Sequence, residues 1–321
     1  MSLFFRALTF FLRPMTKVSA LVISVILLIS GPALTPPAEP NAPLDAAAIQ
    51  LNFSVLSDIH MESYTMDRFT NLRAGLVDMA NAAVPNDALA LVGDNTMNGQ
   101  FFEYLMLYSH LTKYNSVKPE NTLVAMGNHD MNKNKQSAET AIAWHNAHYN
   151  AYTGSNNDKP YYSRIIKGSY FIVLGDEFAY PDATALISDA QLSWLRGTME
   201  QAAATGKPIF IFCHQPFNDK FAHWVGGLGE QSDAVWEIIN AYAGTDVLFF
   251  SGHLHTPIDY FGVTKVENVI LVDDTVYNGD VKGLGYQVEV YPESIAIRAR
   301  NYISGEWLPG SNYSFSRVNP E

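Results

Sequence analysis

The chain has 321 residues, of which 48% are hydrophobic and 16% are charged. This composition excludes a disordered or coiled-coil protein, and the length suffices to bury a large core without disulfides or a structural metal. Acidic residues number 32 against 20 Lys and Arg, which gives a formal net charge of −12. We therefore expect no stable binding to nucleic acid, because that requires a basic surface.

Residues 1–33 have the features of a targeting segment. Three basic residues, Arg6, Arg13 and Lys17, precede an almost purely apolar run at 18–29, and small residues follow. The run is shorter than the roughly 20 residues of a membrane span and is typical of a secretory signal peptide. An uncleaved N-terminal anchor is the alternative, and it would be the protein's contact with the membrane. We expect a secreted or extracytoplasmic protein with a Pro- and Ala-rich linker at 34–50.

Beyond residue 50, predicted strands and helices alternate. Apolar runs predict strands, and a hydrophobic period of 3.6 residues predicts helices. In chain order we expect a strand at 53–57, a helix at 67–83, a strand at 88–92, a helix at 101–114, a strand at 122–126, a helix at about 137–150 and a strand at 170–174. Ser188 and Gln191 form a capping box that starts a further helix, and strands at 208–213 and 247–250 follow.

The pattern changes after residue 257. Short strands without helices are expected at 269–272, 286–291 and 295–302. Alternating elements followed by consecutive strands predict one α/β domain at 51–321 with an antiparallel C-terminal portion. The sequence shows no boundary to a second domain.

Five of the predicted strands end in polar clusters. These are Asp58-Ile59-His60, Gly93-Asp94-Asn95, Gly127-Asn128-His129-Asp130, Cys213-His214-Gln215-Pro216 and Ser251-Gly252-His253-Leu254-His255. Ligands of open α/β sheets bind beyond the carboxyl ends of the strands, so the clusters are expected to meet. Because side chains alternate along a strand, Asp58 and His60 are expected to project to the same side. The glycines are expected to allow close approach of the backbone.

The polar clusters contain the donor atoms of a metal centre. Two aspartates, one asparagine and four histidines make up the set: Asp58, Asp94, Asn128, His60, His214, His253 and His255. Seven donors are too many for one ion with an open position, and they suit two ions roughly 3.5–4 Å apart that share one carboxylate. Imidazole, carboxylate and amide ligands favour two divalent transition-metal ions (Fe, Mn, Zn or Ni) over Ca or Mg.

In order and residue type, the five clusters resemble the calcineurin-like metallophosphoesterase superfamily, whose motifs are D-x-H, G-D, G-N-H-D/E, H and G-H-x-H. The resemblance spans Asp58 to His255. Each short motif is weak alone, whereas all five in order after apolar strands are specific. The resemblance implies a four-layer α/β/β/α sandwich, with two mixed sheets flanked by helices. It also implies a hydrolase that cleaves phosphoester bonds with a metal-bridging hydroxide as the nucleophile.

The resemblance further implies a role for each residue. The first metal would be bound by Asp58, His60 and His255, and the second by Asn128, His214 and His253. Asp94 would bridge both metals. His129 would protonate the leaving-group oxygen as a general acid, or clamp the phosphoryl group.

One position departs from the motifs of two branches of the family, the protein phosphatases and the purple acid phosphatases. Protein phosphatases carry an Asp three residues after the G-D aspartate, followed by Arg-Gly, whereas this chain has Met97 there and lacks the arginine. Purple acid phosphatases would have a tyrosine ligand in the place of Met97. The remaining likeness is to bacterial members, including the cyclic-nucleotide phosphodiesterase branch. His129 therefore needs an orienting partner other than that aspartate; Asp130 is adjacent in the sequence.

We expect a phosphodiesterase in preference to a phosphomonoesterase, acting on a small-molecule or polymeric phosphoester. Nucleotides, glycerophosphodiesters and phosphorylated envelope polymers all qualify as substrates outside the membrane. A catalytically silent scaffold of the same fold is the alternative from another class; loss of ligands would mark it, and no ligand is missing here. A metal-dependent amidohydrolase is excluded because the opening motif of that family is H-x-H.

Overall fold

The computed structural model describes residues 46–132, 137–178, 183–217, 227–258, 260, 262–273 and 276–320. The expected targeting segment at 1–33 and most of the expected linker at 34–50 lie outside these ranges. The described end of that linker contains a short 3-10 helix, η1 (Ala46–Ala48). In the described ranges, no helix combines the length and the apolar character that a membrane crossing requires.

The first sheet has six strands in the order β12-β11-β10-β1-β2-β3. Their bounds are β1 (Leu51–Leu56), β2 (Ala88–Val92), β3 (Thr122–Ala125), β10 (Leu284–Val290), β11 (Ser294–Asn301) and β12 (Glu306–Ser316). Strands β1, β2 and β3 run parallel, whereas β10, β11 and β12 are antiparallel to their neighbours. The early and late parts of the chain therefore share this sheet, and they meet where Phe53 of β1 pairs with both Ala88 and Val288.

The second sheet also has six strands, in the order β4-β5-β6-β7-β9-β8. Their bounds are β4 (Tyr162–Ile166), β5 (Ser169–Val173), β6 (Ile209–Phe212), β7 (Val247–Phe250), β8 (Val263–Val266) and β9 (Val269–Val272). The central strands β5, β6, β7 and β9 are parallel, and β4 and β8 close the two edges in antiparallel orientation. Both sheets are therefore mixed, as expected from the sequence.

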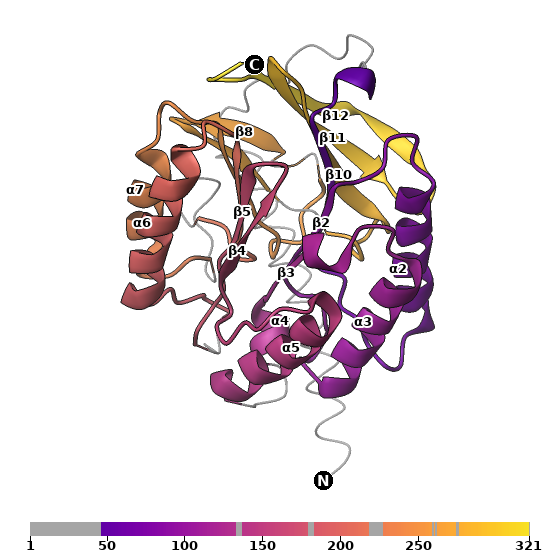
Figure 1. The fold of residues 1–321 in the computed structure, drawn as a ribbon. Coiled ribbons are helices and arrows are strands. Elements are labelled where there is room, and N and C mark those ends of the chain that lie inside the picture. Colours follow the sequence, from indigo (N-terminus) through magenta and orange to yellow (C-terminus); the bar gives the residue numbers. More distant parts are fainter. Residues whose placement is uncertain are drawn as a thin grey trace, which may run out of the picture. The chain divides into compact units, whose positions relative to one another are not determined.

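Helices cover the outer faces of the two sheets, as Figure 1 shows. On one side lie α2 (Met66–Ala80), α3 (Phe101–Tyr114), η2 (Pro119–Asn121), α4 (Asn128–Asn132) and α5 (Ala138–Thr153), and on the other side lie α6 (Asp189–Ala203) and α7 (Ser232–Asn240). Contacts join α2 to α3, α3 to α5, and α6 to α7. The arrangement is the four-layer α/β/β/α sandwich that the sequence predicts.

The core shows the two-residue period of a buried strand. In β6, Phe210 and Phe212 belong to the cluster between the sheets, whereas Ile209 and Ile211 belong to the cluster beneath α6 and α7. Phe53 of the first sheet contacts the rings of Phe171, Phe210, Phe212 and Phe250 of the second, with centroid distances of 4.8–6.4 Å. These edge-to-face contacts join the two sheets.

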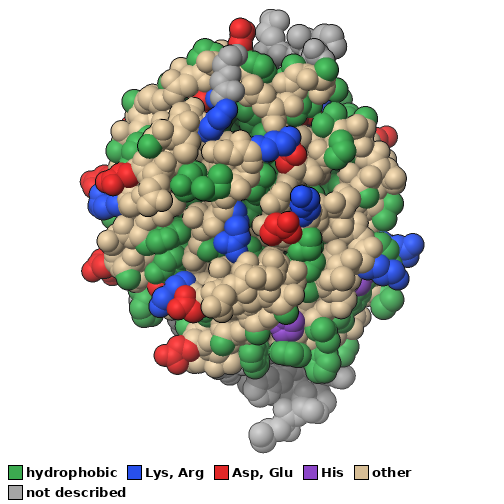
Figure 2. Space-filling view, in the orientation of Figure 1, with side chains coloured by type: hydrophobic (Ala, Val, Ile, Leu, Met, Phe, Trp, Pro, Cys, Tyr) green, Lys and Arg blue, Asp and Glu red, His purple; other side chains and the backbone are tan. Residues whose placement is uncertain are grey.

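The surface view in Figure 2 shows acidic and basic side chains interspersed with hydrophobic ones. Among the described residues of this face, neither charge forms a continuous patch. The largest exposed apolar side chains of α3 are Phe101, Phe102 and Leu105.

The boundaries of the predicted elements agree with the structure to within three residues at each end. The sequence analysis did not predict β4, α4, α7, β8 or β12. The capping box at α6 is half correct. The Ser188 hydroxyl accepts a hydrogen bond from the Gln191 backbone N–H, but the Gln191 side chain bonds Gly175 and Glu177 instead of reaching back to the cap.

Candidate metal centre

The eight predicted site residues lie just after the carboxyl ends of five strands. From the first sheet, β1 leads to Asp58 and His60, β2 to Asp94, and β3 to Asn128 and His129; from the second sheet, β6 leads to His214 and β7 to His253 and His255. The structure brings all eight together through hydrogen bonds, ion pairs and ring contacts. Both sheets therefore contribute to one site.

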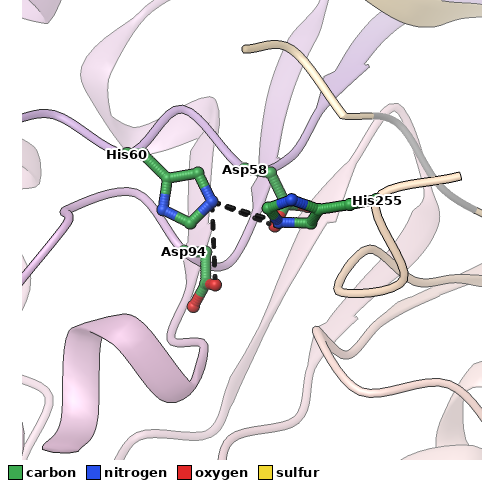
Figure 3. Close-up of side chains that lie close together, drawn as sticks. All are labelled: Asp58, His60, Asp94 and His255. Carbon is green, nitrogen blue, oxygen red and sulfur yellow. Dashed lines mark hydrogen bonds and ion pairs between the residues drawn. The ribbon is translucent and has the colours of Figure 1, made fainter. Parts of the chain in front are cut away.

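Four of these residues form a first group of converging donor atoms. One donor atom from each of Asp58, His60, Asp94 and His255 lies within 4.8 Å of all the others. Figure 3 shows the imidazole of His60 pointing toward His255 and toward Asp94. The group is buried except for His255, whose side chain is 47% exposed and forms the open side.

The donor distances in the first group fit a metal ion. The Nε2 atoms of His60 and His255 lie 3.2 Å apart, and Oδ1 of Asp58 lies 2.8 Å from the His255 Nε2 atom. Ligand nitrogens about 2 Å from one ion are separated by about 3 Å, so this spacing accommodates a cation among the three donors. Burial raises the pKa of Asp58, but His214 and His255 outweigh burial and hold it well below its usual range. Asp58 is therefore ionised and able to bind a cation.

A second group contains Asn128, His214 and His253. Oδ1 of Asn128 lies 2.9 Å from Nδ1 of His253, and the rings of His253 and His214 are 5.2 Å apart. Burial lowers the pKa of His253 to about 4, so its ring is neutral and able to donate a lone pair. Amide oxygen and neutral imidazole are ligands of the transition metals expected from the sequence.

The buried ring of His214 fits a cation beside Asp94. Its Nδ1 atom donates a hydrogen bond of 2.8 Å to the carbonyl of Val92, so Nε2 is the ring atom that faces Asp94. That Nε2 atom has no hydrogen-bond partner among the described residues and lies 3.3 Å from Oδ1 of Asp94. Burial lowers the pKa of His214, but Asp94 and Asp58 overcome it and raise the pKa to about 10. At neutral pH this pKa places a proton on Nε2, between the ring and Oδ1 of Asp94, and a bound metal ion would replace that proton.

Asp94 lies between the two groups. Its Oδ1 atom faces His214, and its Oδ2 atom lies 4.0 Å from Nε2 of His60. The backbone N–H of His129 also donates to Oδ1 over 2.8 Å. Although burial raises the pKa of Asp94, His214 dominates the balance and lowers it to about 2, which keeps the carboxylate charged.

The ligand-bearing turns have an uncommon backbone. Five predicted ligands have positive φ: Asp58 (54°), His60 (48°), Asp94 (46°), His253 (80°) and His255 (54°). The convergence of Asp58 and His60 was predicted correctly, but the reason was wrong. Strand β1 ends at Leu56, so the left-handed turn, and not strand alternation, aims both side chains at one point. Non-glycine residues rarely adopt this conformation, and such strain clusters at functional sites.

His129 lies at the edge of the centre. Its Nδ1 atom donates to the backbone carbonyl of Met97 over 2.8 Å, and its Nε2 atom lies 3.9 Å from Oδ2 of Asp94. The side chain is 20% exposed, whereas the side chain of Asp94 is 2% exposed. The orienting partner of His129 is therefore a backbone carbonyl at the position where protein phosphatases carry an aspartate.

Asp130 organises the adjoining turns. Its carboxylate accepts hydrogen bonds from the backbone N–H groups of Asn95, Thr96 and Gly127, at 2.9–3.1 Å. It thereby ties the turn after β2 to the turn after β3. The sequence analysis named Asp130 only as a neighbour of His129, and it did not identify the Met97 carbonyl, because a backbone atom leaves no residue signature.

Comparisons with known proteins agree with this architecture. A family model of the calcineurin-like phosphoesterases matches residues 51–257. The chain belongs to this family and is a metal-dependent phosphoesterase. Among solved structures, a dimetal phosphatase from Danio rerio is 12% identical, with a TM-score of 0.60 over 84% of this chain and 99% of that chain.

A second solved structure is a predicted phosphoesterase from Streptococcus pneumoniae. It is 14% identical, with a TM-score of 0.39 over 83% of this chain and 98% of that chain. A search of curated proteins finds no match. The similarity to the Danio rerio phosphatase shows that the two proteins share their fold.

Proposed function

We propose that the chain is a phosphodiesterase with two metal ions that share Asp94. The supporting observation is the position of this carboxylate, because its two oxygens face separate donor groups at His60 and His214. A shared carboxylate is the usual link in centres of this kind. We assign Asp58, His60 and His255 to the first ion, and Asn128, His214 and His253 to the second.

Divalent ions in such a centre supply a hydroxide nucleophile at neutral pH and neutralise the phosphate oxygens. The chain supplies the proton for the leaving group. Because Nδ1 of His129 is engaged by the Met97 carbonyl, Nε2 is the ring position that exchanges a proton. In the imidazolium form, His129 donates its Nε2 proton to the leaving-group oxygen as the ester bond breaks.

The uncharged segment that follows Asp94 favours a diester substrate over a monoester. A monoester carries a second negative charge, which fixed cations commonly balance. The segment at 95–99, between Asp94 and α3, contains no charged residue, and the arginine of the protein-phosphatase motif is absent from it. A diester with one negative charge does not need that additional cation.

The proposal also includes the location of the enzyme. The basic and apolar pattern at 6–33 favours export, so we propose phosphoesters outside the cytoplasm as the substrates. These are small-molecule or polymeric phosphodiesters of the cell surroundings.

The test is a matched pair of substrates, bis(p-nitrophenyl) phosphate and p-nitrophenyl phosphate. The purified protein is chelated and then reloaded separately with Mn, Fe, Zn or Ni. We expect activity only after reloading, with kcat/KM for the diester at least about tenfold above that for the monoester, which corresponds to about 1.4 kcal/mol. A higher kcat/KM for the monoester with every metal would identify a phosphomonoesterase instead. Full activity without metal would contradict the metal centre.

A further inference from the structure

The turn that carries Asp58 and His60 is held in an unfavourable conformation. Both residues have positive φ, at 54° and 48°, and neither is a glycine. Residues held in sparsely populated backbone regions cost on the order of 1–3 kcal/mol each, and they persist only when surrounding contacts fix them. The contacts that fix this turn are therefore part of the metal centre.

The N–H groups of the turn are fixed by the turn after β2. The N–H of Asp58 donates to the carbonyl of Gly93 over 3.1 Å, and the N–H of His60 donates to the carbonyl of Asp94 over 2.8 Å. These bonds link two ligand-bearing segments to each other. The three carbonyl groups of the Asp58–His60 turn need hydrogen-bond donors from other parts of the chain.

Two residues outside the five motifs bind those carbonyls. Asn278 donates to the carbonyl of Ile59 from its side-chain Nδ2 atom over 2.7 Å, and to the carbonyl of Asp58 from its backbone N–H over 3.3 Å. Arg68 of α2 donates from Nη1 to the carbonyl of His60 over 2.5 Å. All three successive carbonyls are thereby held.

The orientation of the Asn278 amide is itself fixed. Its Oδ1 atom accepts a hydrogen bond of 2.9 Å from Nδ2 of Asn71 on α2, which turns its own Nδ2 group toward Ile59. The hydroxyl of Tyr277 in turn donates to the carbonyl of Asn71. An aspartate at 278 would keep the contact with Asn71 but would place a carboxylate oxygen against the Ile59 carbonyl.

We propose that Asn278 and Arg68 are positioning residues that hold Asp58 and His60 in their metal-binding conformation. This inference rests on the proposed two-ion centre. Asn278 lies beyond β9, far from the turn in sequence, and both residues act through backbone carbonyls. Partners that orient metal ligands commonly contribute about 10–100-fold to metal affinity.

The test measures Mn²⁺ binding by calorimetry on the full chain after chelation. We expect two ions for the wild-type protein. Asn278→Ala and Asn278→Asp should each weaken one ion about 10–100-fold and change the other less than about threefold. Excess Mn²⁺ should restore most of kcat. Arg68→Met should behave similarly, whereas Arg68→Lys, which keeps a donor, should retain most of the affinity.

The matched control is Asn115→Ala. The Asn115 amide donates to Thr122 and Tyr152 at the opposite end of the first sheet, so its loss should lower stability without changing Mn²⁺ affinity. Unchanged Mn²⁺ affinity in both Asn278→Ala and Arg68→Met would overturn the inference. If the Asn278 variants do not fold, the comparison of Arg68→Met with Arg68→Lys tests the inference without them. A wild-type protein that binds fewer than two ions would instead contradict the proposed function.

Discussion

At the scale of single residues, backbone carbonyls decide which ring nitrogen two of the site histidines offer. Val92 accepts from Nδ1 of His214, and Met97 accepts from Nδ1 of His129, so both rings present Nε2 toward the centre. The same hydrogen bond from Nδ1 to a backbone carbonyl therefore orients two rings in different surroundings. The buried His214 ring faces Asp94, whereas the more exposed His129 ring lies at the edge of the centre.

Replacing His129 should slow catalysis without removing metal. We expect His129→Ala to keep its metal content and to lose rate by roughly 10²–10⁴-fold with alkyl or nucleoside esters, as for other general acids. Nitrophenyl esters should lose much less, because nitrophenolate departs without a proton. The comparison is between kcat values for the two leaving-group classes, with metal analysis of the same samples.

Two results would change the role of His129. Equal losses for both leaving groups would indicate that the side chain clamps the phosphoryl group instead of donating a proton. A loss of bound metal would make His129 a ligand.

At the scale of elements, the strands deliver their ligands through abrupt turns that need small residues. A Cβ at Gly127 would meet Oδ1 of Asp94 and would lie 2.5 Å from the backbone N of Asp94 and 2.6 Å from Cδ2 of His214. All three contacts involve residues of the centre, and one of them involves the backbone. Glycine at this position therefore allows β3 to approach the ligands of β2 and β6.

Gly127→Ala should therefore disturb the centre together with the turn that carries Asp94. We expect metal affinity to fall by at least about tenfold, which is the scale for misplaced ligands. Gly197→Ala is the control, because a Cβ there in α6 meets nothing within 4 Å and alanine favours a helix. Equal metal affinities in the two variants, measured by competition with a chelating dye, would show that Gly127 has no spatial role at the centre.

The elements that sequence reasoning missed have weak local signals. Strand β12 (Glu306–Ser316) contains Pro309 and Gly310 and lies at a sheet edge, where proline is tolerated but a strand is hard to recognise. Helix α7 (Ser232–Asn240) has only nine residues and no side-chain cap. Buried parallel strands such as β2, by contrast, are short, unbroken apolar runs, and they were predicted with the correct bounds.

The candidate site was predictable because its chemistry is carried by side chains. The order and type of the motif residues sufficed to name Asp94 and His129. The left-handed turns, the Met97 carbonyl and the contact of Asn278 with the Asp58–His60 turn depend on backbone geometry and on distant pairing. Residue identity carries almost no signal for such features.

At the scale of the whole molecule, one buried histidine sets part of the acid stability. His145 of α5 is fully buried between the rings of Tyr104 and Tyr149, and neither ring nitrogen has a hydrogen-bond partner among the described residues. Burial, with a smaller contribution from His148, lowers its pKa to about 3. In the unfolded chain His145 binds a proton near pH 6.5, whereas in the folded protein it stays neutral down to about pH 3. The free energy of unfolding therefore decreases as the pH falls from about 6.5 toward 3.

His145→Phe should remove this dependence. Urea unfolding at pH 7 and pH 4 should show that the variant loses about 3 kcal/mol less than the wild-type protein over this interval. His110→Phe, at a histidine of α3 that is not fully buried, is the control for the replacement of a helical histidine by phenylalanine. A His145→Phe profile parallel to that of the wild-type protein would show that His145 is not buried in its neutral form.

We propose that Asp94 joins two ions at the ends of the two sheets. Anomalous diffraction from crystals of the Mn-loaded protein tests it most directly. We expect two peaks roughly 3.5–4 Å apart, one on each side of the Asp94 carboxylate. A single peak, or a second peak that Asp94 does not contact, would contradict it.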